Sequence, residues 1–283
     1  MIAPPPLPPI ILDPIVRLAL AEDLGRAGDL TTDATIPPDT EMTCFLNARG
    51  DGRLAGLDAA MHTLALVDPD ARIAPQKSDG DGLNEGDLIA RLEGSARSIL
   101  TAERTMLNFV GRLSGVATLT ARYVDLVADT GTKIVCTRKT TPGHRALEKR
   151  AVRCGGGTSH RYGLDDAILI KDNHIAACGS IGDAMSRAKA YAGHLRMIEI
   201  EVDTLDQLEE ALPYEPDAVL LDNMSTDELK QAVTLVKGQC KTEASGGVTL
   251  ETVADIAQTG VDYISVGALT HSAINLDVGL DAA

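Results

Sequence analysis

Charged side chains follow several apolar runs in the C-terminal half of the chain, at the point where each run ends. Arg138 and Lys139 follow one run, Lys171 follows the next, and Glu201 and Asp222 end two further runs. A guanidinium or an ammonium group binds carboxylates and phosphates. Paired carboxylates can bind ribose hydroxyls, hold Mg²⁺ or stabilise a cationic sugar. These residue types predict a site for an anionic substrate with a sugar beside it.

The basic side chains gather in one region of an otherwise acidic protein. The chain has 26 Lys and Arg against 41 Asp and Glu, a net charge of −15. Residues 133–171 nevertheless form a conspicuously basic stretch, which includes His160 and Arg161. A solvated helix face would explain residues 145–153, but it explains Arg138 and Lys139 poorly because they directly follow an apolar run. The stretch therefore predicts a basic pocket.

Two glycine-containing segments predict phosphate sites. Ser245, Gly246 and Gly247 follow the fifth apolar run and precede a helical pattern that starts near Thr249, so free backbone N–H groups can point at an anion. Gly267 follows the sixth run, the position of the late-loop phosphate site of β/α barrels. A basic pocket, two phosphate sites and carboxylates facing a sugar together describe phosphoribosyl transfer.

The elements that must position these residues alternate regularly after residue 131. Six apolar runs read as strands, at residues 133–137, 167–170, 197–202, 218–221, 242–244 and 263–266. Helical patterns lie between most of them, at residues 181–192, 204–212, 226–236 and 250–259. Apolar strands that alternate with helices indicate a parallel sheet covered on both faces. Six such units favour a closed β/α barrel, which would place every strand end described above on one rim.

The N-terminal part has a different pattern. A helix is predicted with Asp13 as its N-cap and Pro14 in its first turn. Short runs separated by Gly/Asp turns between residues 41 and 93 predict antiparallel strands, interrupted by a helix at 58–67. Residues 97–129 predict a long helix that breaks near Gly111 or Gly115.

Composition excludes several classes of protein. Aromatic residues make up 2% of an acidic chain, which is against a base-stacking nucleic-acid platform. No apolar stretch approaches the roughly 18 residues that a membrane span needs, and the N-terminus lacks the pattern of a secretory signal. The five cysteines are scattered and odd in number, as expected for reduced thiols. We expect a cytoplasmic protein with no nucleic-acid or membrane partner.

With these motifs in order, the sequence resembles quinolinate phosphoribosyltransferase (nicotinate-nucleotide pyrophosphorylase, carboxylating). The likeness runs from about residue 11 to 281 and rests on residues 22–25, 28–32, 103–108, 137–143 and 155–157, His160-Arg161, Lys171-Asp172-Asn173-His174, residues 199–202, Leu221-Asp222-Asn223, Ser245-Gly246-Gly247 and residues 265–267.

The resemblance implies an α/β fold of two domains. Residues 1–115 would form an N-terminal α/β sandwich, joined by the tail 271–283. Residues 116–270 would form an incomplete β/α barrel of the type II phosphoribosyltransferase kind. It also implies a homodimer whose active sites are shared between subunits, and leaves open whether dimers assemble further.

The resemblance further implies the substrates quinolinate and phosphoribosyl pyrophosphate, with Mg²⁺ as cofactor. Arg138, His160, Arg161 and Lys171 would bind quinolinate, with Arg104 donated by the partner subunit. Lys139, Lys171, Glu201 and Asp222 would be catalytic, and the last two would hold Mg²⁺ directly or through water. The phosphates would be bound by Ser245, Gly246, Gly247 and Gly267. The chain departs from the family at Thr158 and Ser159, where a His-Asn pair is common, and at His144, where an aliphatic residue is usual.

Three alternatives stay open at this stage. A paralogue associated with molybdenum transport shares the fold, but diverges around the Lys171-Asp172-Asn173-His174 segment, which is intact here. A Schiff-base aldolase would use Lys171 as nucleophile and would leave Arg138 and Arg161 without a role. A phosphometabolite sensor would bind the same ligands without turnover.

Overall fold

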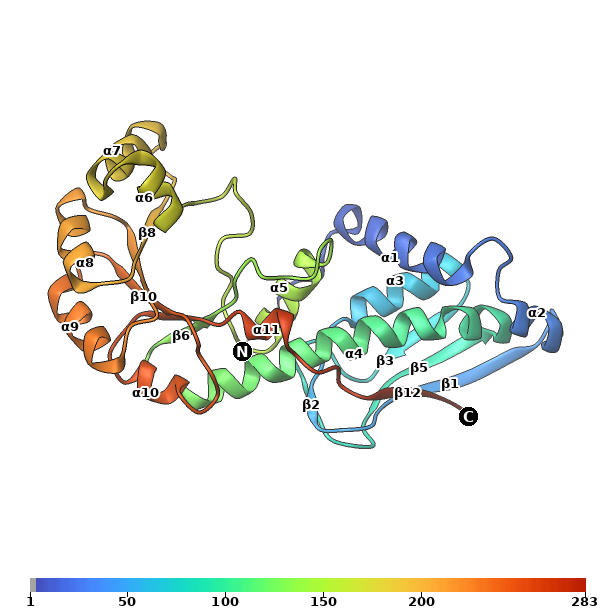
Figure 1. Cartoon of the computed structure of the whole chain (residues 1–283). Helices are drawn as coiled ribbons and strands as arrows, with labels where there is room; N and C mark the ends of the chain where they lie inside the picture. The colour runs from blue at the N-terminus through green and yellow to red at the C-terminus, as the bar shows by residue number, and fades with distance from the viewer. Residues whose placement is uncertain (1–3) are drawn as a thin grey trace. The chain divides into compact units, whose positions relative to one another are not determined.

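The computed structural model describes residues 4–283 and divides them into two compact units (Figure 1). The first unit comprises the chain up to residue 121 together with residues 140–156 and 269–283, and the second comprises residues 122–139 and 157–268. No helix among the described residues is long and apolar enough to cross a membrane. All five cysteines are free thiols.

The first unit contains an antiparallel sheet in the order β12-β1-β5-β3. These strands are β12 (Val278–Ala282), β1 (Glu41–Ala48), β5 (Leu88–Ser95) and β3 (Arg72–Pro75), and a small second sheet pairs β2 (Gly52–Arg53) with β4 (Gly82–Leu83). The helices of this unit include α1 (Pro9–Leu24), α2 (Leu30–Thr35), α3 (Leu57–Val67), most of α4 (Ala96–Leu126) and α5 (Arg145–Cys154). The predicted antiparallel strands and the helix at 58–67 are confirmed.

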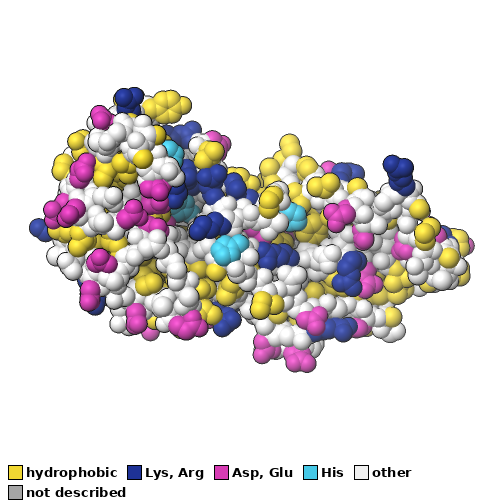
Figure 2. All heavy atoms as spheres, viewed as in Figure 1, with side chains coloured by type: hydrophobic (Ala, Val, Ile, Leu, Met, Phe, Trp, Pro, Cys, Tyr) yellow, Lys and Arg dark blue, Asp and Glu magenta, His cyan; other side chains and the backbone are white. Residues whose placement is uncertain are grey.

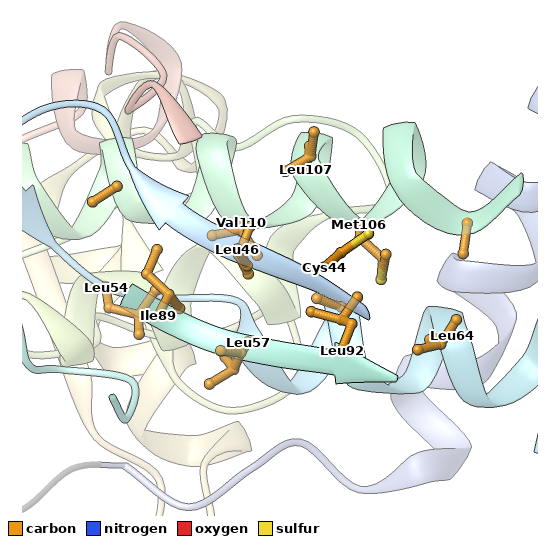
Figure 3. Close-up of a cluster of buried hydrophobic side chains, with 14 of the residues drawn as sticks. Cys44, Leu46, Leu54, Leu57, Leu64, Ile89, Leu92, Met106, Leu107 and Val110 are labelled. Carbon is orange, nitrogen blue, oxygen red and sulfur yellow. The ribbon is translucent and has the colours of Figure 1, made fainter. Parts of the chain in front are cut away.

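The core of this unit lies between the sheet and its helices (Figure 3). On β1, Cys44, Leu46 and Ala48 are buried while the residues between them are partly exposed, because successive side chains point to opposite faces of a strand. Helices α3 and α4 contribute Leu64 and Val110 to the same cluster. A buried side chain of this size contributes about 1.5–3 kcal/mol.

Helix α4 is continuous over 31 residues, so the predicted break near Gly111 or Gly115 is wrong. A Cβ atom on Gly111 would lie 3.0 Å from the carbonyl oxygen of Leu276, and one on Gly115 would overlap that of Ile274. The Leu276 N–H donates to the Gly111 carbonyl at 2.9 Å. The absence of a side chain at these glycines therefore lets the segment that leads to β12 pack directly against α4, and the helix is not interrupted.

Helix α1 begins at Pro9, so the prediction of Asp13 as its N-cap is also wrong. Leu12, Val16 and Leu20 are buried along one face of the helix, and burial of Leu12 extends the helix to the N-terminal side of Pro14. Asp13 instead accepts a hydrogen bond from Arg17 Nε at 2.7 Å.

Residues 140–156, which a single boundary near residue 115 assigns to the barrel, belong to the first unit. Glu148 on α5 is buried and accepts hydrogen bonds from the Thr141 N–H at 2.9 Å and from Arg112 Nη2 at 2.8 Å. On the same helix, Arg150 Nη1 pairs with Asp79. These polar contacts attach α5 to the unit that contains the antiparallel sheet.

The second unit contains a six-stranded parallel sheet in the order β6-β11-β10-β9-β8-β7. Its strands are β6 (Lys133–Val135), β11 (Tyr263–Ser265), β10 (Lys241–Ser245), β9 (Ala218–Asp222), β8 (Ile198–Val202) and β7 (Ile168–Ile170). The helices include α6 (Asp172–Cys178), α7 (Ile181–Tyr191), α8 (Leu205–Ala211), α9 (Thr226–Val236), α10 (Val253–Ala257) and α11 (Ala268–His271), whose last residues belong to the first unit. The six predicted strands and their parallel order are confirmed.

The sheet does not close into a complete barrel. Within residues 4–283, the edge strands β6 and β7 form no ladder with each other, and β6 is instead bridged by Thr158 through Val135. The Thr158 N–H donates to the Ile134 carbonyl at 2.8 Å. A loop residue therefore occupies the position that a further strand would take, and the incomplete barrel replaces the closed one expected from strand count.

Candidate active site

A cavity of about 380 Å³ lies at the carboxyl ends of the strands in the second unit. Most of the predicted site residues line it: Arg138, Lys139, His160, Arg161, Lys171, Glu201, Asp222 and Ser245. On this unit, Lys and Arg side chains gather beside acidic ones (Figure 2). The sheet thus brings together charges from strand ends that lie far apart in the sequence.

Arg138 and Arg161 give the cavity two N–H donors that suit an anion. The Nε atom of each is buried and has no hydrogen-bond partner among the described residues. Burial, and then the charge of Arg138, lower the pKa of Arg161. Buried N–H donors without an acceptor are costly, and two neighbouring cations add repulsion. An anion between them would relieve both costs.

Lys171 and Glu201 form an ion pair across the ends of neighbouring strands β7 and β8. Lys171 precedes α6, and its N–H donates to Nδ1 of His174 at 3.0 Å. The carboxylate of Glu201 thus occupies the amino group that a Schiff-base aldolase would use as its nucleophile. The pair places one positive and one negative charge in the wall of the cavity.

The loops after β9 and β10 pack against each other. The Asn223 N–H donates to the Ser245 carbonyl at 2.9 Å, and Asn223 Nδ2 donates to Asp222 Oδ2 at 2.6 Å. Gly246 has φ +94°, and a Cβ atom there would overlap Oδ1 of Asn223. Glycine is therefore required at position 246 both by conformation and by space.

The backbone after β10 remains a candidate phosphate site, but not at the start of a helix. Helix α10 begins at Val253 and has five residues, so the prediction of a helix from near Thr249 is wrong. Gly247 has φ +57°, and no atom lies within 4 Å of where its Cβ would be. Successive backbone N–H groups in a turn can bind an anion without a helix. Gly246, Gly247 and Gly267 adjoin lining residues and are not themselves part of the cavity wall.

His160 lines the cavity, but both of its ring nitrogens contact protein atoms. Nε2 lies 3.0 Å from Oε2 of Glu199, and Nδ1 accepts a hydrogen bond from the Arg161 N–H at 2.8 Å. Glu243 lies beside this ring and also lines the cavity. Sequence reasoning did not select Glu199 or Glu243 as site residues. The available signal was an acidic residue at an inward position of an otherwise buried strand.

The other predicted residues lie outside this cavity wall. Arg104 is exposed on α4 in the first unit, where the described residues give it no hydrogen bond or ion pair. His144, one of the departures from the family pattern, stacks its ring on Phe109 with centroids 6.3 Å apart. Ser159, another departure, lines a second cavity on the parallel-sheet unit rather than the first.

Comparisons with known proteins show which proteins this chain resembles. Residues 29–114 match the model of the quinolinate phosphoribosyl transferase N-terminal domain, and residues 116–281 match that of the C-terminal domain. A nicotinate-nucleotide pyrophosphorylase [carboxylating] from Mycobacterium leprae is 47% identical over 94% of this chain and 95% of its own. A probable enzyme of that name from Bacillus subtilis is 45% identical over 92% and 89%.

Among solved structures, the nicotinate-nucleotide pyrophosphorylase from Francisella tularensis aligns with a TM-score of 0.94 and 41% identity, covering 98% of both chains. Both family domains thus occur in the expected order, and the segment that contains the cavity lies within the matched C-terminal domain. The chain belongs to the quinolinate phosphoribosyl transferase family.

Proposed function

We infer that this protein transfers the phosphoribosyl group of phosphoribosyl pyrophosphate to quinolinate with loss of CO₂, giving nicotinate mononucleotide and pyrophosphate in de novo NAD biosynthesis. The observation that carries this assignment is the pair of buried Arg138 and Arg161 Nε donors without an acceptor in the cavity. Quinolinate carries two adjacent carboxylates, and burial of such a dianion requires fixed cations. The family membership selects this dianion among the possible ones.

The two substrates would occupy opposite sides of the cavity. Quinolinate would bind at the side of Arg138 and Arg161. The ribose would lie toward Glu201 and Asp222, at the ends of neighbouring strands β8 and β9. Lys139, which follows β6 and lines the same cavity, would face the phosphates. The ring nitrogen can then attack the anomeric carbon from the side opposite to the departing pyrophosphate.

Charge develops in two places as the bond to pyrophosphate breaks. The sugar gains oxocarbenium character, which the carboxylates of Glu201 and Asp222 stabilise. The leaving phosphates gain negative charge, which the Lys139 ammonium stabilises. Because these groups are already held at strand ends, they require little reorganisation during the reaction.

The donor set at this end of the cavity fits Mg²⁺. Glu201 and Asp222 offer carboxylate oxygens at one rim, and Mg²⁺ in such sites is held by one or two carboxylates, water and substrate phosphates. We propose that these two residues hold the ion directly or through water. When bound, Mg²⁺ would neutralise charge on the pyrophosphate.

Decarboxylation needs little additional machinery. Once the nitrogen carries the ribose, the ring is positively charged and accepts the electron pair released when the 2-carboxylate leaves as CO₂. A proton then replaces the carboxylate at that carbon. The basic side of the cavity stabilises the carboxylates before this step and is compatible with loss of neutral CO₂.

Assembly and location extend this proposal. We propose a homodimer in which Arg104 of one subunit completes the cavity of the other, since Arg104 is exposed and belongs to the first unit. We also propose a cytoplasmic location, because all five cysteines are free thiols.

The direct test measures pyrophosphate and CO₂ release from quinolinate, phosphoribosyl pyrophosphate and Mg²⁺. Both products should form in equal amounts. Nicotinate, which lacks the 2-carboxylate, serves as the control and should react poorly. Binding of both substrates without product would instead indicate a sensor, and covalent trapping of a keto substrate by borohydride would indicate an aldolase.

A further inference from the structure

Two acidic residues on strands of the parallel sheet are buried, at positions where the interior of a barrel is usually filled by Val, Ile or Leu. Glu199 on β8 is 9% exposed and Glu243 on β10 is 5% exposed. Both line a second cavity of about 240 Å³ that includes the first residues of strands β7, β9, β10 and β11. Glu243 and His160 line the substrate cavity as well. The polar cluster formed by His160, Glu199 and Glu243 therefore lies between the two cavities.

The contacts of His160 define its tautomer. Nδ1 accepts the Arg161 N–H at 2.8 Å, so Nδ1 carries no proton. Nε2 must then carry the ring proton, and it lies 3.0 Å from Glu199 Oε2 and 3.5 Å from Glu243 Oε1. The ring thus donates from Nε2 to Glu199 and accepts at Nδ1 from the main chain.

This arrangement does not suit a metal ion. The cluster is a group of three possible ligands within 4.8 Å of one another. A histidine bound to a metal through Nε2 donates its Nδ1–H to an acceptor, whereas Nδ1 here faces an N–H donor. The three side chains are consequently arranged around a proton on Nε2.

Glu243 reduces the cost of placing two carboxylates together. Its Oε1 is buried and has no hydrogen-bond partner among the described residues. Burial, and then the charge of Glu199, raise the pKa of Glu243 to about 7. A raised pKa favours the protonated acid, so the cluster need not hold two negative charges side by side.

We propose that Glu199 and Glu243 are positioning residues for quinolinate binding, which orient the His160 ring so that its Nδ1 fixes the main chain at Arg161. The Arg161 side chain extends from this main chain. Its Nη1 donates to the Ala167 carbonyl at 3.3 Å, and its Nε has no hydrogen-bond partner among the described residues. A binding group is effective only if its own rotamer is held by the surrounding side chains. This proposal rests on the proposed quinolinate site.

A spectroscopic test examines the wild-type protein directly. Long-range ¹⁵N–¹H correlation spectra of histidine-labelled protein should show His160 as the neutral tautomer with the proton on Nε2, assigned by its loss in His160→Gln. His174 provides an internal reference, because its Nδ1 also accepts a backbone N–H. A protonated His160 imidazolium, or the tautomer with the proton on Nδ1, would overturn the proposal whether or not quinolinate is the substrate.

Kinetics test the consequence for binding. Glu199→Leu should raise KM for quinolinate about tenfold, the effect of losing the buried hydrogen bond from His160 Nε2. Glu243→Leu, which removes the second carboxylate beside Nε2, should raise it less. KM for phosphoribosyl pyrophosphate and kcat should stay within about twofold. Glu199→Gln and Glu243→Gln keep an acceptor oxygen and should restore most of the affinity. Glu209→Gln on the exposed face of α8 is the matched control.

The outcomes separate the two proposals. A wild-type enzyme that does not use quinolinate removes the proposed function, and the tautomer is still decided by the spectra. If quinolinate is used but the Leu variants lower kcat alone, or raise both KM values equally, the positioning role is wrong. If the Leu variants do not fold, the Gln variants decide the question. A Gln variant whose His160 spectrum is unchanged but whose KM for quinolinate rises about tenfold would also contradict the positioning role.

Discussion

The guanidinium groups of Arg138 and Arg161 share one cavity, and burial followed by the charge of Arg138 lowers the pKa of Arg161. The two residues come from loops after β6 and before β7, the edge strands of the parallel sheet. The gap in the barrel is thus where two like charges meet.

Removal of either arginine should weaken quinolinate binding. Arg138→Ala or Arg161→Ala should cost about 2–5 kcal/mol, because each leaves a buried carboxylate without its partner. Binding of phosphoribosyl pyrophosphate should change much less. Calorimetry with both ligands checks this, with the exposed Arg187→Ala on α7 as control. Equal weakening of both ligands would remove the arginines from the quinolinate site.

Neutralisation of Asp222 should affect turnover more than binding. Asp222→Asn keeps the size of the side chain and removes the charge that faces the sugar, so kcat should fall while KM for quinolinate changes little. Steady-state kinetics at saturating Mg²⁺ measures both constants. Near-normal kcat would show that Asp222 does not stabilise the oxocarbenium character of the ribose.

A methyl group at Gly246 should disturb the loop after β10. Gly246→Ala would force the side chain of Asn223 to move and would place alanine at φ +94°, a strain of about 1–3 kcal/mol. We expect a lower melting temperature and a raised KM for phosphoribosyl pyrophosphate. Gly82→Ala, at a glycine with open space and no positive φ, is the control. Unchanged KM with lowered stability would separate this loop from phosphate binding.

Mixing of two inactive variants tests the shared active site. Arg104→Ala and Lys171→Ala homodimers should each be nearly inactive. After subunit exchange, about half of the dimers are mixed, and each mixed dimer has one site with both lesions and one with neither. About a quarter of wild-type activity should therefore return. Exchange without recovery would place the function of Arg104 within its own subunit, or exclude it from the reaction.

An alanine at Gly115 should destabilise the first unit without affecting the chemistry. Its Cβ would overlap the carbonyl oxygen of Ile274, and such overpacking costs about 1–3 kcal/mol. Denaturant unfolding of Gly115→Ala against Gly193→Ala, where the added methyl meets no neighbour, measures this cost. An unchanged unfolding midpoint would mean that the tail can shift away from α4.

The sequence predicted the parallel sheet well because its strands are marked by the residues that follow them. Lys171, Glu201 and Asp222 each stand at the end of a buried apolar run, and all three line one cavity. The same logic could not find Glu199 and Glu243. They lie within strands β8 and β10, before the strand ends. There the sequence pattern predicts which way a side chain points, but not which residue of another strand it contacts.

Local signals failed where distant segments determine the structure. Gly111 and Gly115 predict a helix break by composition, but each admits the segment before β12. Pro14 predicts a helix start, yet burial of Leu12 extends α1 past it. The loop that bridges β6 through Thr158 leaves no mark in the alternation of strands and helices, which is why a strand count favours a closed barrel.

The pairing of β12 with β1 has a consequence for synthesis. The register joins Cys44 to Ala282 and Ala48 to Val278, and the second unit lies between these strands in the sequence. A ribosome therefore releases the whole parallel sheet before the antiparallel one receives its edge strand. Domains tend to fold in the order in which they emerge. During translation, strand β1 of the first unit should therefore lack its hydrogen-bonding partner β12. The unit that begins the chain is thus the one that finishes folding last.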